Sequence, residues 1–361
     1  MKVGRSGMIN ERPCFVLYKE KLDKNIATLI EIERLSAVQI LYSLKSFNEV
    51  SVLPIIASNL SGMSVSSCSE IEMAANASVK KMHLYAPAYK KEKLLSMIDK
   101  VETISFNSLS QWEMFSNLNA DVSKGLRINP KLHLPIPSYC NPNLSYSRLG
   151  VDYEKFLMAY QEDKGTFSAL EGLHFHALFQ SSADGVQILF DHLLEHYQEL
   201  LPTLKWLNLG GGHNFTDKDY NVDAFVKMIA QFKQSYPNIE LYFEPGESVL
   251  KGCGDFVTTV LDIIPSDDRE IVILDTSIET HLLDVAIVNQ RLTVKGTNSS
   301  STPYFYELAG NSCLQGDIIG EYFFEEKLEI GDEVIFEDML PYTMVKMTEF
   351  NGMERASFKI I

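Results

Sequence analysis

The larger, N-terminal part of the chain contains short apolar runs that recur at intervals, with longer segments between them. Eight of these runs have the length and composition of buried strands, namely residues 40–44, 63–67, 82–86, 103–106, 125–129, 172–176, 206–209 and 241–243. Several intervening segments place their apolar residues at helical spacing, namely residues 69–78, 90–100, 110–118, 184–201 and 221–236. This alternation predicts a parallel (β/α)8 barrel over residues 16–247, since such a barrel needs about 200 to 250 residues.

The pattern changes after Glu247. Strand-like segments follow that are separated by turn residues and show little helical periodicity, namely residues 254–264, 270–276, 291–296, 332–338 and 356–361. They predict a mainly β domain of residues 248–361. Because residues 13–18 are also strand-like, we expect residues 1–15 to join this domain. The predicted fold is therefore an α/β barrel with a second, mainly β domain.

The composition is that of an ordinary globular protein, with 45% hydrophobic residues. No apolar run is long enough to cross a membrane, and the N-terminal residues lack the apolar segment of a signal peptide. We therefore expect a cytoplasmic protein. The five cysteines are scattered and lack CxxC spacing, which predicts reduced thiols and neither a disulfide framework nor a metal site.

The formal net charge of −16 argues against nucleic acid and against an anionic membrane surface as partners, because both would be repelled. The same charge would attract a cationic ligand, although an acidic surface can equally serve solubility alone. The charge therefore narrows the class of partner without identifying a ligand.

Residues suited to chemistry stand at five of the eight predicted strand ends, where a barrel enzyme carries its active site. They are Lys45, Arg127 with Asn129, His174 with His176, the glycines 210–212 with His213, and Glu244 with Gly246 and Glu247. Each has a structural alternative: a charge can mark a strand exit, a histidine can be hydrogen-bonded in the core, and a glycine run can be a turn. Their coincidence at one end of a barrel favours a functional site.

A lysine, a carboxylate, an imidazole and a glycine-rich loop in one barrel mouth match the needs of pyridoxal 5'-phosphate. Its aldehyde forms a Schiff base with a lysine amine, and its pyridine nitrogen needs an acidic partner to keep its proton. Its flat ring needs a surface on which to stack. Its phosphate needs backbone N–H donors, which glycines between a strand and a predicted helix over residues 220–232 are suited to provide.

Nine motifs follow one another along nearly the whole chain, namely YSLKS, VSSCSEIEMA, LRINP, SRLG, HFHAL, LNLGGG, EPGE, NSCLQGD and PYTMVKMTEFNG. This ordered set resembles the fold-type III pyridoxal phosphate-dependent decarboxylases, which include the ornithine, diaminopimelate and carboxynorspermidine decarboxylases. Within this family, the short chain, HFHAL and EPGE are most similar to the carboxynorspermidine/carboxyspermidine decarboxylases. The resemblance implies an alanine racemase-like fold, a barrel followed by a β domain, in agreement with the pattern above.

The resemblance assigns roles around the cofactor to residues of the predicted barrel. It implies that Lys45 is the Schiff-base lysine, that His176 stacks on the pyridine ring, and that Glu244 holds the proton of the pyridine nitrogen. Arg127 matches an arginine near the cofactor whose role is less defined. We therefore expect these residues to contact the cofactor, with Lys45, His176 and Glu244 taking part in catalysis.

The resemblance also implies a phosphate site made by Gly211, Gly212 and the backbone around Gly246, with a further hydrogen bond from Tyr342. The chain departs from the family beside this site. Glu247 replaces the arginine that usually follows EPG, and residues 177–179 replace a glycine–serine pair. Because a carboxylate repels phosphate, we expect Glu247 to pair with an ammonium group of the substrate instead.

Two residues of the β domain are implied to complete the site from a neighbouring subunit. Cys313 matches a cysteine that handles the proton after carbon dioxide leaves, and we expect Asp317 to accept a hydrogen bond from the distal amine of the substrate. Both assignments require a homodimer with shared active sites. Without the resemblance, Cys313 would be interpreted as a buried structural thiol.

The implied activity is decarboxylation of carboxynorspermidine or carboxyspermidine, cationic carboxylated triamines of polyamine biosynthesis. These substrates differ by one methylene group, so the sequence does not discriminate between them. The main alternative is diaminopimelate decarboxylase or another basic amino-acid decarboxylase of this fold, but a second substrate carboxylate would call for a cation where this chain is acidic. A non-catalytic homologue or a single-domain cofactor carrier fits less well, because Lys45, His176 and Glu244 are all present and a β domain follows the barrel.

Overall fold

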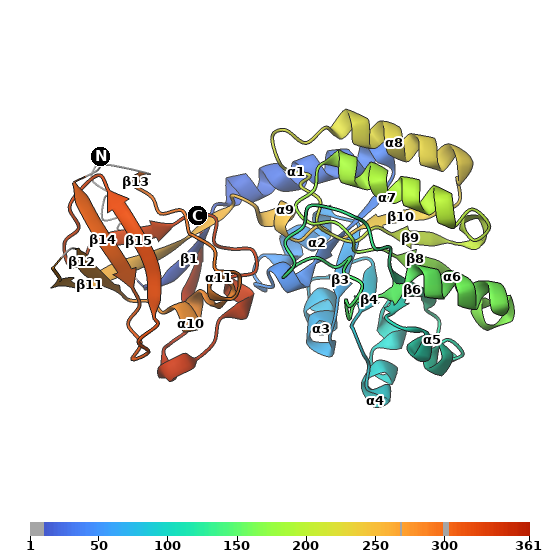
Figure 1. Ribbon diagram of the computed structural model, residues 1–361, viewed down its shortest axis with the longest axis horizontal. Coiled ribbons are helices and arrows are strands. Elements are labelled where there is room, and N and C mark those ends of the chain that lie inside the picture. The colour runs from blue at the N-terminus through green and yellow to red at the C-terminus, as the bar shows by residue number, and fades with distance from the viewer. Residues whose placement is uncertain (1–10, 268, 299–302) are drawn as a thin grey trace. The chain divides into compact units, whose positions relative to one another are not determined.

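The protein forms two compact units (Figure 1). We describe a computed structural model of residues 11–267, 269–298 and 303–361. The barrel unit comprises residues 25–249, and the β unit combines residues up to Lys24 with residues 250–361. The chain therefore contributes to the β unit twice, once before and once after the barrel unit.

The barrel unit is built on eight parallel strands, which are β2 (Gln39–Ser43), β3 (Gly62–Val65), β4 (Met82–Tyr85), β5 (Thr103–Phe106), β6 (Ser123–Asn129), β8 (Gly172–His174), β9 (Trp206–Asn208) and β10 (Glu240–Phe243). The circle closes because β10 pairs with β2 and β5 pairs with β6. The predicted (β/α)8 barrel is thus confirmed. Several strands end one or two residues earlier than predicted, because buried residues such as Leu44 and Phe175 continue the apolar run into the following loop.

Helices alternate with these strands, as expected (Figure 1). The five predicted helical segments are α3 (Cys68–Asn76), α4 (Lys91–Leu95), α5 (Leu109–Phe115), α7 (Ala183–His196) and α8 (Val222–Ser235). The structure adds α1 (Lys19–Ser36), α2 (Leu53–Asn59), α6 (Tyr153–Glu162), α9 (Glu247–Leu250), the short strand β7 (Val151–Asp152), and the 3-10 turns η1 (Leu44–Ser46), η2 (Ile98–Lys100), η3 (Lys164–Phe167) and η4 (Leu201–Thr203). Ser67, Ser108 and Asn221 cap α3, α5 and α8 by accepting a backbone hydrogen bond, which stabilises the first turn. Among the described residues, no helix has both the length and the apolarity needed to cross a membrane.

Trp206 fills the interior of the barrel near the starts of β8 and β9. Its indole Nε1 donates a hydrogen bond to Ser123 Oγ at 2.8 Å, and its ring lies against the backbone of Gly125 and Gly172. The ring of His83 meets the indole edge-on, with centroids 5.4 Å apart. The two glycines leave the room that this large side chain needs, so their lack of a side chain is a packing requirement.

The β unit contains the strands β1 (Cys14–Leu17), β11 (Gly254–Pro265), β12 (Glu270–Leu274), β13 (Thr297–Asn298), β14 (Tyr304–Ala309), β15 (Ile318–Phe324), β16 (Glu333–Phe336) and β17 (Ser357–Ile360). Their order is β13-β15-β14-β12-β11-β1-β17, and β16 also pairs with β11. The unit further contains α10 (Ile278–His281), α11 (Leu283–Val288), η5 (Met344–Lys346) and η6 (Phe350–Gly352). Because β1 lies between β11 and β17, the N-terminal strand joins this unit, as expected.

The predicted strands of the β unit need two corrections. Residues 291–296 are not a strand, since only Val294 forms an isolated bridge. Conversely, β14 and β15 are absent from the prediction. Their register places Glu307 opposite Glu321, and Arg269 forms ion pairs with both carboxylates. Facing like charges oppose strand pairing, and here a residue from outside both strands compensates for them.

Replacing Gly172 with alanine is expected to destabilise the protein by about 1–3 kcal/mol, because the added methyl group would overlap the indole ring of Trp206. Gly316→Ala is the matched control, since a methyl group there meets no atom within 4 Å. Urea denaturation followed by circular dichroism measures both variants. A Gly172 variant as stable as the wild type would contradict this packing.

Candidate active site

The predicted catalytic residues of the barrel unit lie at the C-terminal ends of its strands. Lys45 lies in η1 directly after β2, His176 lies two residues after β8, and Glu244 directly follows β10. Strand β10 pairs with β2, and the backbone N–H of Ser43 donates to Pro245 O at 3.3 Å. The segments that carry Lys45 and Glu244 are therefore neighbours in the barrel mouth.

Lys45 is exposed to solvent although the residues on either side of it are buried. The surrounding barrel nevertheless removes much of its hydration and thereby lowers the pKa of the Lys45 amine. The carboxylates of Glu244 and Glu70 oppose this shift, and the charge of Arg127 reinforces it. Lys45 is thus accessible and surrounded by protein at once, and its lowered pKa increases the fraction of neutral, nucleophilic amine.

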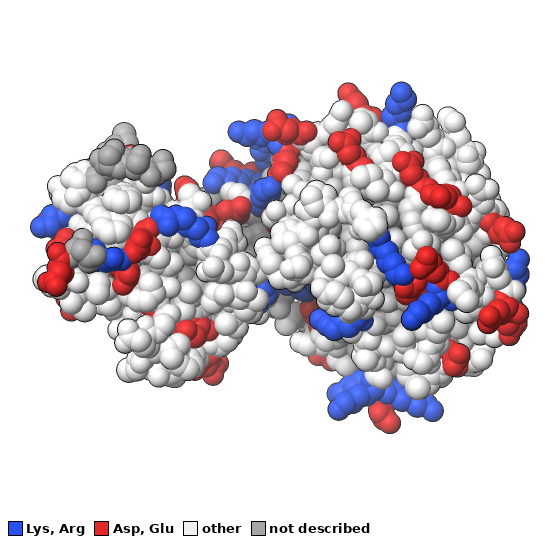
Figure 2. Space-filling view, viewed as in Figure 1, with Lys and Arg blue, Asp and Glu red and all other residues white. Residues whose placement is uncertain are grey.

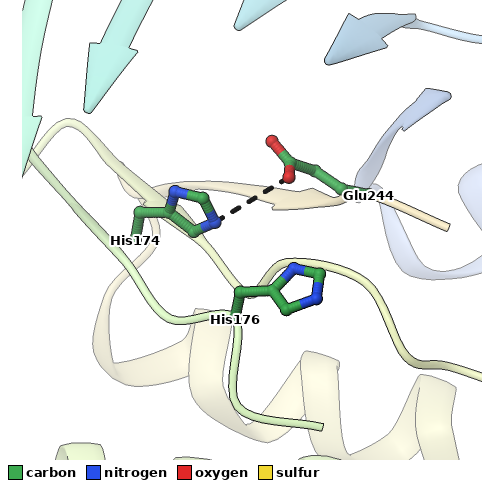
Figure 3. Close-up of side chains that lie close together, drawn as sticks. All are labelled: His174, His176 and Glu244. Carbon is green, nitrogen blue, oxygen red and sulfur yellow. Dashed lines mark ion pairs between the residues drawn. The ribbon is translucent and has the colours of Figure 1, made fainter. Parts of the chain in front are cut away.

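Glu244 is a buried carboxylate with defined neighbours (Figure 3). Its Oε1 accepts a hydrogen bond from Asn208 Nδ2 at 2.7 Å, and its Oε2 lies 3.8 Å from His174 Nε2. Its backbone N–H donates to Gly210 O at 2.7 Å, which joins the end of β10 to the glycine segment. Asn208 is not among the predicted site residues. The signal that could have identified it is a lone amide in the apolar run Trp206–Leu209.

The two histidines of HFH have different surroundings. His174 is buried, and neither of its ring nitrogens has a hydrogen-bond partner. His176 is half-buried, and its Nδ1 accepts a hydrogen bond from the backbone N–H of Gly211 at 3.1 Å, which leaves its proton on Nε2. Burial lowers the pKa of both imidazoles well below the usual value, and the charges of Lys45 and Arg127 act in the same direction. Both rings are therefore neutral at pH 7, and the contact of His174 with the carboxylate is not an ion pair.

His174, His176 and Glu244 offer three possible metal ligands whose atoms all lie within 4.8 Å of one another (Figure 3). Neutral imidazoles and a carboxylate suit several divalent metals. However, Lys45 and Arg127 act electrostatically on this group and oppose a further cation, whereas they attract an anionic ligand. The charges around the group therefore favour a phosphorylated cofactor over a metal ion.

The glycine segment after β9 excludes side chains at all three positions. A Cβ atom on Gly210, whose φ is +66°, would lie 2.7 Å from His176 Cα. Gly212 has a left-handed backbone with φ of +85°, and a Cβ atom there would overlap the carbonyl oxygen of Leu178. A Cβ atom on Gly211 would lie 2.6 Å from the carbonyl oxygen of Glu244. The following helix α8 begins at Val222, so its predicted start at residue 220 is wrong and a loop separates the glycines from the helix.

Arg127, in β6, is also buried at this end of the barrel. Its guanidinium carbon lies 4.6 Å from the ring centroid of Tyr85, at the end of β4. Burial lowers the pKa of Arg127, and Tyr85 and Glu244 oppose this shift, but an arginine remains charged. Tyr85 itself donates to Asn107 Oδ1 at 2.7 Å. Tyr85 is thus a further residue of this region that the sequence does not identify.

Gly246 and Glu247 lie in the segment after β10. A Cβ atom on Gly246 would approach Ser46 Cβ to 2.7 Å, so this segment packs against the turn that carries Lys45. Glu247 begins α9, and its Oε1 accepts a hydrogen bond from Gln180 Nε2 at 3.0 Å. Glu247 and residues 177–179 are the two places at which this chain differs from the pattern that it resembles. The hydrogen bond from Gln180 joins these two places.

Three predicted site residues lie in the β unit. Cys313 is exposed, and Tyr342 is half-buried with a left-handed φ of +64°. Asp317 is buried, and its carboxylate accepts backbone hydrogen bonds from Ile278 at 2.8 Å and Ser312 at 3.0 Å. Asp317 therefore stabilises its own loop. Its role toward a substrate amine stays a prediction, as do the roles of Cys313 and Tyr342.

The residues of the barrel mouth fit pyridoxal phosphate. Lys45 presents an accessible amine of lowered pKa, and the carboxylate of Glu244 is buried one residue beyond the strand that pairs with β2. Beside them, His174 leaves both ring nitrogens without a partner. Such burial is unfavourable in free energy unless the binding of a ligand provides hydrogen bonds in this region. An aldehyde, a basic ring nitrogen and an anionic phosphate on one molecule would use these groups together.

Comparison with known proteins identifies the family. Residues 24–251 match the pyridoxal binding domain of the pyridoxal-dependent decarboxylases, and residues 181–339 match their C-terminal sheet domain. The chain is 34% identical to a carboxynorspermidine/carboxyspermidine decarboxylase of Campylobacter jejuni, over 97% of this chain and 93% of the relative. It is 36% identical to a carboxyaminopropylagmatine decarboxylase of Synechocystis, over 94% of this chain and 87% of the relative.

A solved structure gives the same result for the fold. The crystal structure of carboxynorspermidine decarboxylase from Campylobacter jejuni, complexed with norspermidine, superposes with a TM-score of 0.87 at 33% sequence identity. The match covers 98% of this chain and 94% of that one, so it includes both the barrel unit and the β unit. The chain therefore belongs to the pyridoxal-dependent decarboxylases, enzymes whose cofactor is pyridoxal phosphate.

Proposed function

We propose that this enzyme decarboxylates carboxynorspermidine or carboxyspermidine and so produces norspermidine or spermidine. The observation that carries the proposal is the similarity to the Campylobacter jejuni decarboxylase over nearly the full length of both chains. A cytoplasmic location is part of the proposal, in keeping with five cysteines that are all free thiols.

The barrel residues divide the chemical work in this proposal. Bound pyridoxal phosphate supplies the electron sink that accepts the electron pair released as carbon dioxide leaves. Lys45 would provide the amine that holds the cofactor, and its lowered pKa favours the nucleophilic form. Glu244 keeps a proton on the pyridine nitrogen, because a buried carboxylate stabilises an adjacent positive charge.

The remaining cofactor contacts of the proposal come from four further segments. The half-buried ring of His176 packs on one face of the pyridine ring, held there by the N–H of Gly211. Backbone groups of Gly212 and Gly246 would bind the phosphate, whereas the N–H of Gly211, also predicted for this role, already donates to His176. A phosphate contact from Tyr342 stays a prediction. Arg127 adds a buried positive charge on the same side of the barrel, which suits an anionic cofactor.

A cationic substrate suits the charge of the protein. The net charge is −16, and Figure 2 shows acidic and basic side chains interspersed over the visible face of the barrel unit. Such a distribution attracts a polycation from a distance and does not define a docking site. We assign the local contact to Glu247, which replaces an arginine of the family pattern and is bonded to Gln180.

A second candidate substrate is carboxyaminopropylagmatine, since the Synechocystis relative is as similar as the Campylobacter jejuni one. An agmatine moiety ends in a guanidinium group, whereas the triamines end in an ammonium group. Both cations would be met by a carboxylate such as Glu247. Diaminopimelate is disfavoured, because its distal carboxylate would face this acidic residue.

We also propose that two subunits share each active site, with Cys313 and Asp317 supplied by the neighbouring subunit. Cys313 is exposed on its own chain, as a residue that serves a partner must be. In this proposal the Cys313 thiol donates the proton that replaces carbon dioxide. Asp317 already accepts two backbone hydrogen bonds, so it contributes to the distal amine only through its remaining lone pairs.

A substrate panel tests the proposed function directly. We expect the highest kcat/KM on carboxynorspermidine or carboxyspermidine, a measurable rate on carboxyaminopropylagmatine, and values at least about 100-fold lower on diaminopimelate and ornithine. Release of carbon dioxide and chromatography of the amine product provide the measurement. A preference for diaminopimelate would reject the proposal.

Glu247→Gln is expected to raise KM for the preferred triamine by roughly 10- to 100-fold with a smaller change in kcat, because one charged hydrogen bond to the substrate is lost. Glu162→Gln is the control, since it removes the same charge from the exposed C-terminal end of α6, where a barrel helix has returned to the opposite face. Steady-state kinetics of the two variants decide the point. An unchanged KM in the Glu247 variant would place the substrate cation elsewhere.

Mixing Lys45→Ala protein with Cys313→Ala protein is expected to restore activity, although each variant alone is inactive. In a mixed dimer, one site carries both lesions and the other site is intact. Random exchange makes half of the dimers mixed, so recovery should approach about a quarter of the wild-type rate. Subunit exchange is verified with an affinity tag on one variant. Exchange without recovered activity would exclude shared sites.

A further inference from the structure

We infer that His174 is a positioning residue that holds the carboxylate of Glu244 toward the pyridine nitrogen of the cofactor. The inference rests on the role proposed for Glu244 and adds a residue to which no function has been assigned above. His174 does not contact the reacting atoms in this view. It acts through Glu244, as a second hydrogen-bond donor beside Asn208.

The geometry around Glu244 places one potential donor on each carboxylate oxygen, and Figure 3 shows the one on the His174 side. Asn208 Nδ2 donates to Oε1 at 2.7 Å, and His174 Nε2 faces Oε2 at 3.8 Å. The first contact is a full hydrogen bond, and the second is about 1 Å too long for one. A small movement of Glu244 as it meets a protonated ring nitrogen would close the second contact and leave both oxygens held.

His174 differs from the other buried histidines that the structure describes in leaving both of its ring nitrogens without a partner. His83 contacts Thr103 and Ser105 through its two nitrogens, and His281 has partners on both of its nitrogens as well. His192 and His213 each leave one buried ring nitrogen without a partner, so among the described residues only His174 leaves two. Burying such a group without a hydrogen bond costs about 1–3 kcal/mol, so the arrangement calls for a function that compensates for it.

The ring of His174 is held in its orientation by packing. It meets the rings of His83 and Tyr85 edge-on, with centroid distances of 5.3 Å in both cases. Both of these rings belong to β4. In the neighbouring strand β9, Asn208 pairs with His174 and already donates a hydrogen bond to Glu244. A rotation that turned Nε2 away from the carboxylate would therefore have to displace the rings of His83 and Tyr85.

The charge state of His174 suits this task. The ring is buried, and the groups that act on it electrostatically are His83, Arg127, His176 and Lys45, all of which disfavour a second positive charge. A neutral imidazole carries a single N–H, and with that proton on Nε2 it donates to the carboxylate without neutralising it. Glu244 therefore keeps the negative charge that a protonated pyridine nitrogen requires.

The first test compares cofactor affinity in two variants of the apoprotein. His174→Leu removes the donor and keeps an apolar side chain, whereas His174→Gln keeps an amide N–H near the position of Nε2. We expect the leucine variant to bind pyridoxal phosphate roughly 10- to 100-fold more weakly. This is the usual effect of removing a residue that hydrogen-bonds to a ligand-binding side chain. The glutamine variant should recover most of the affinity. Fluorescence titration of apoprotein gives these values without measuring activity.

An analogue separates positioning from packing. In the pyridoxal phosphate analogue with a carbon atom in place of the pyridine nitrogen, no ring nitrogen meets Glu244. The wild type and His174→Leu should therefore bind this analogue equally well. Equal weakening toward both ligands would mean that His174 only packs, and would overturn the inference. His192→Leu, another buried histidine that does not contact Glu244, is the control and should match the wild type with both ligands.

Kinetics of the loaded enzyme distinguish this inference from the role proposed for Glu244. We expect His174→Leu to lower kcat with little change in KM, and to have no further effect in a Glu244→Gln background, because it acts through that carboxylate. Near-normal turnover of Glu244→Gln would reject the proposed role of Glu244 itself. Impaired turnover of Glu244→Gln beside a normal His174→Leu enzyme would reject only the inference about His174.

A measurement on the unmodified ring covers the case in which His174→Leu does not fold. In holoenzyme labelled with ¹⁵N-histidine, the inference requires a neutral His174 with its proton on Nε2, and the signal is assigned by its loss in His174→Gln. Hydrogen-bonded Nε2–H at pH 7 supports the inference. A proton on Nδ1 would overturn it.

Discussion

The parallel pairing of β10 with β2 closes the barrel and creates the site. It joins residues 203 positions apart in the chain, with Gln39 opposite Tyr242 and Ile40 opposite Phe243. Because the two strands are in this register, Lys45 leaves β2 beside the point at which Glu244 leaves β10. The amine and the carboxylate on which the proposed chemistry depends are thus neighbours only as long as the barrel is closed.

Closure also imposes an electrostatic constraint on the barrel mouth. Lys45 and Arg127 bring two positive charges into a region of low hydration, and the carboxylates of Glu244 and Glu70 act against the resulting shift in the pKa of Lys45. The histidines between them are neutral, so they add hydrogen-bonding groups without further charge. This balance leaves a reactive amine and an environment that favours an anionic cofactor.

The barrel could be predicted well from local pattern, since all eight strands and five helices have the expected type and overlap the predicted segments, although several of their ends differ. The β unit could be predicted less well. Strands β14 and β15 place Glu307 and Glu321 opposite each other, an arrangement that depends on Arg269 from outside the pair. Residues 291–296 have strand-like composition but lack a partner along most of their length among the described residues. Strand formation requires a neighbour that a local window does not contain.

The sequence by itself determined which residue types stand at the strand ends, and their order with the surrounding motifs determined the family. Lys45, His176, Glu244 and the glycine segment are found in this way because barrel periodicity and strand exits are local properties. Only the tertiary structure decided that Asn208 bonds to Glu244, that Gly211 bonds to His176, and that His174 faces the carboxylate without a partner. These contacts join strands that are distant in the sequence, and the orientation of a side chain across a closed barrel follows from the packing of all its neighbours at once.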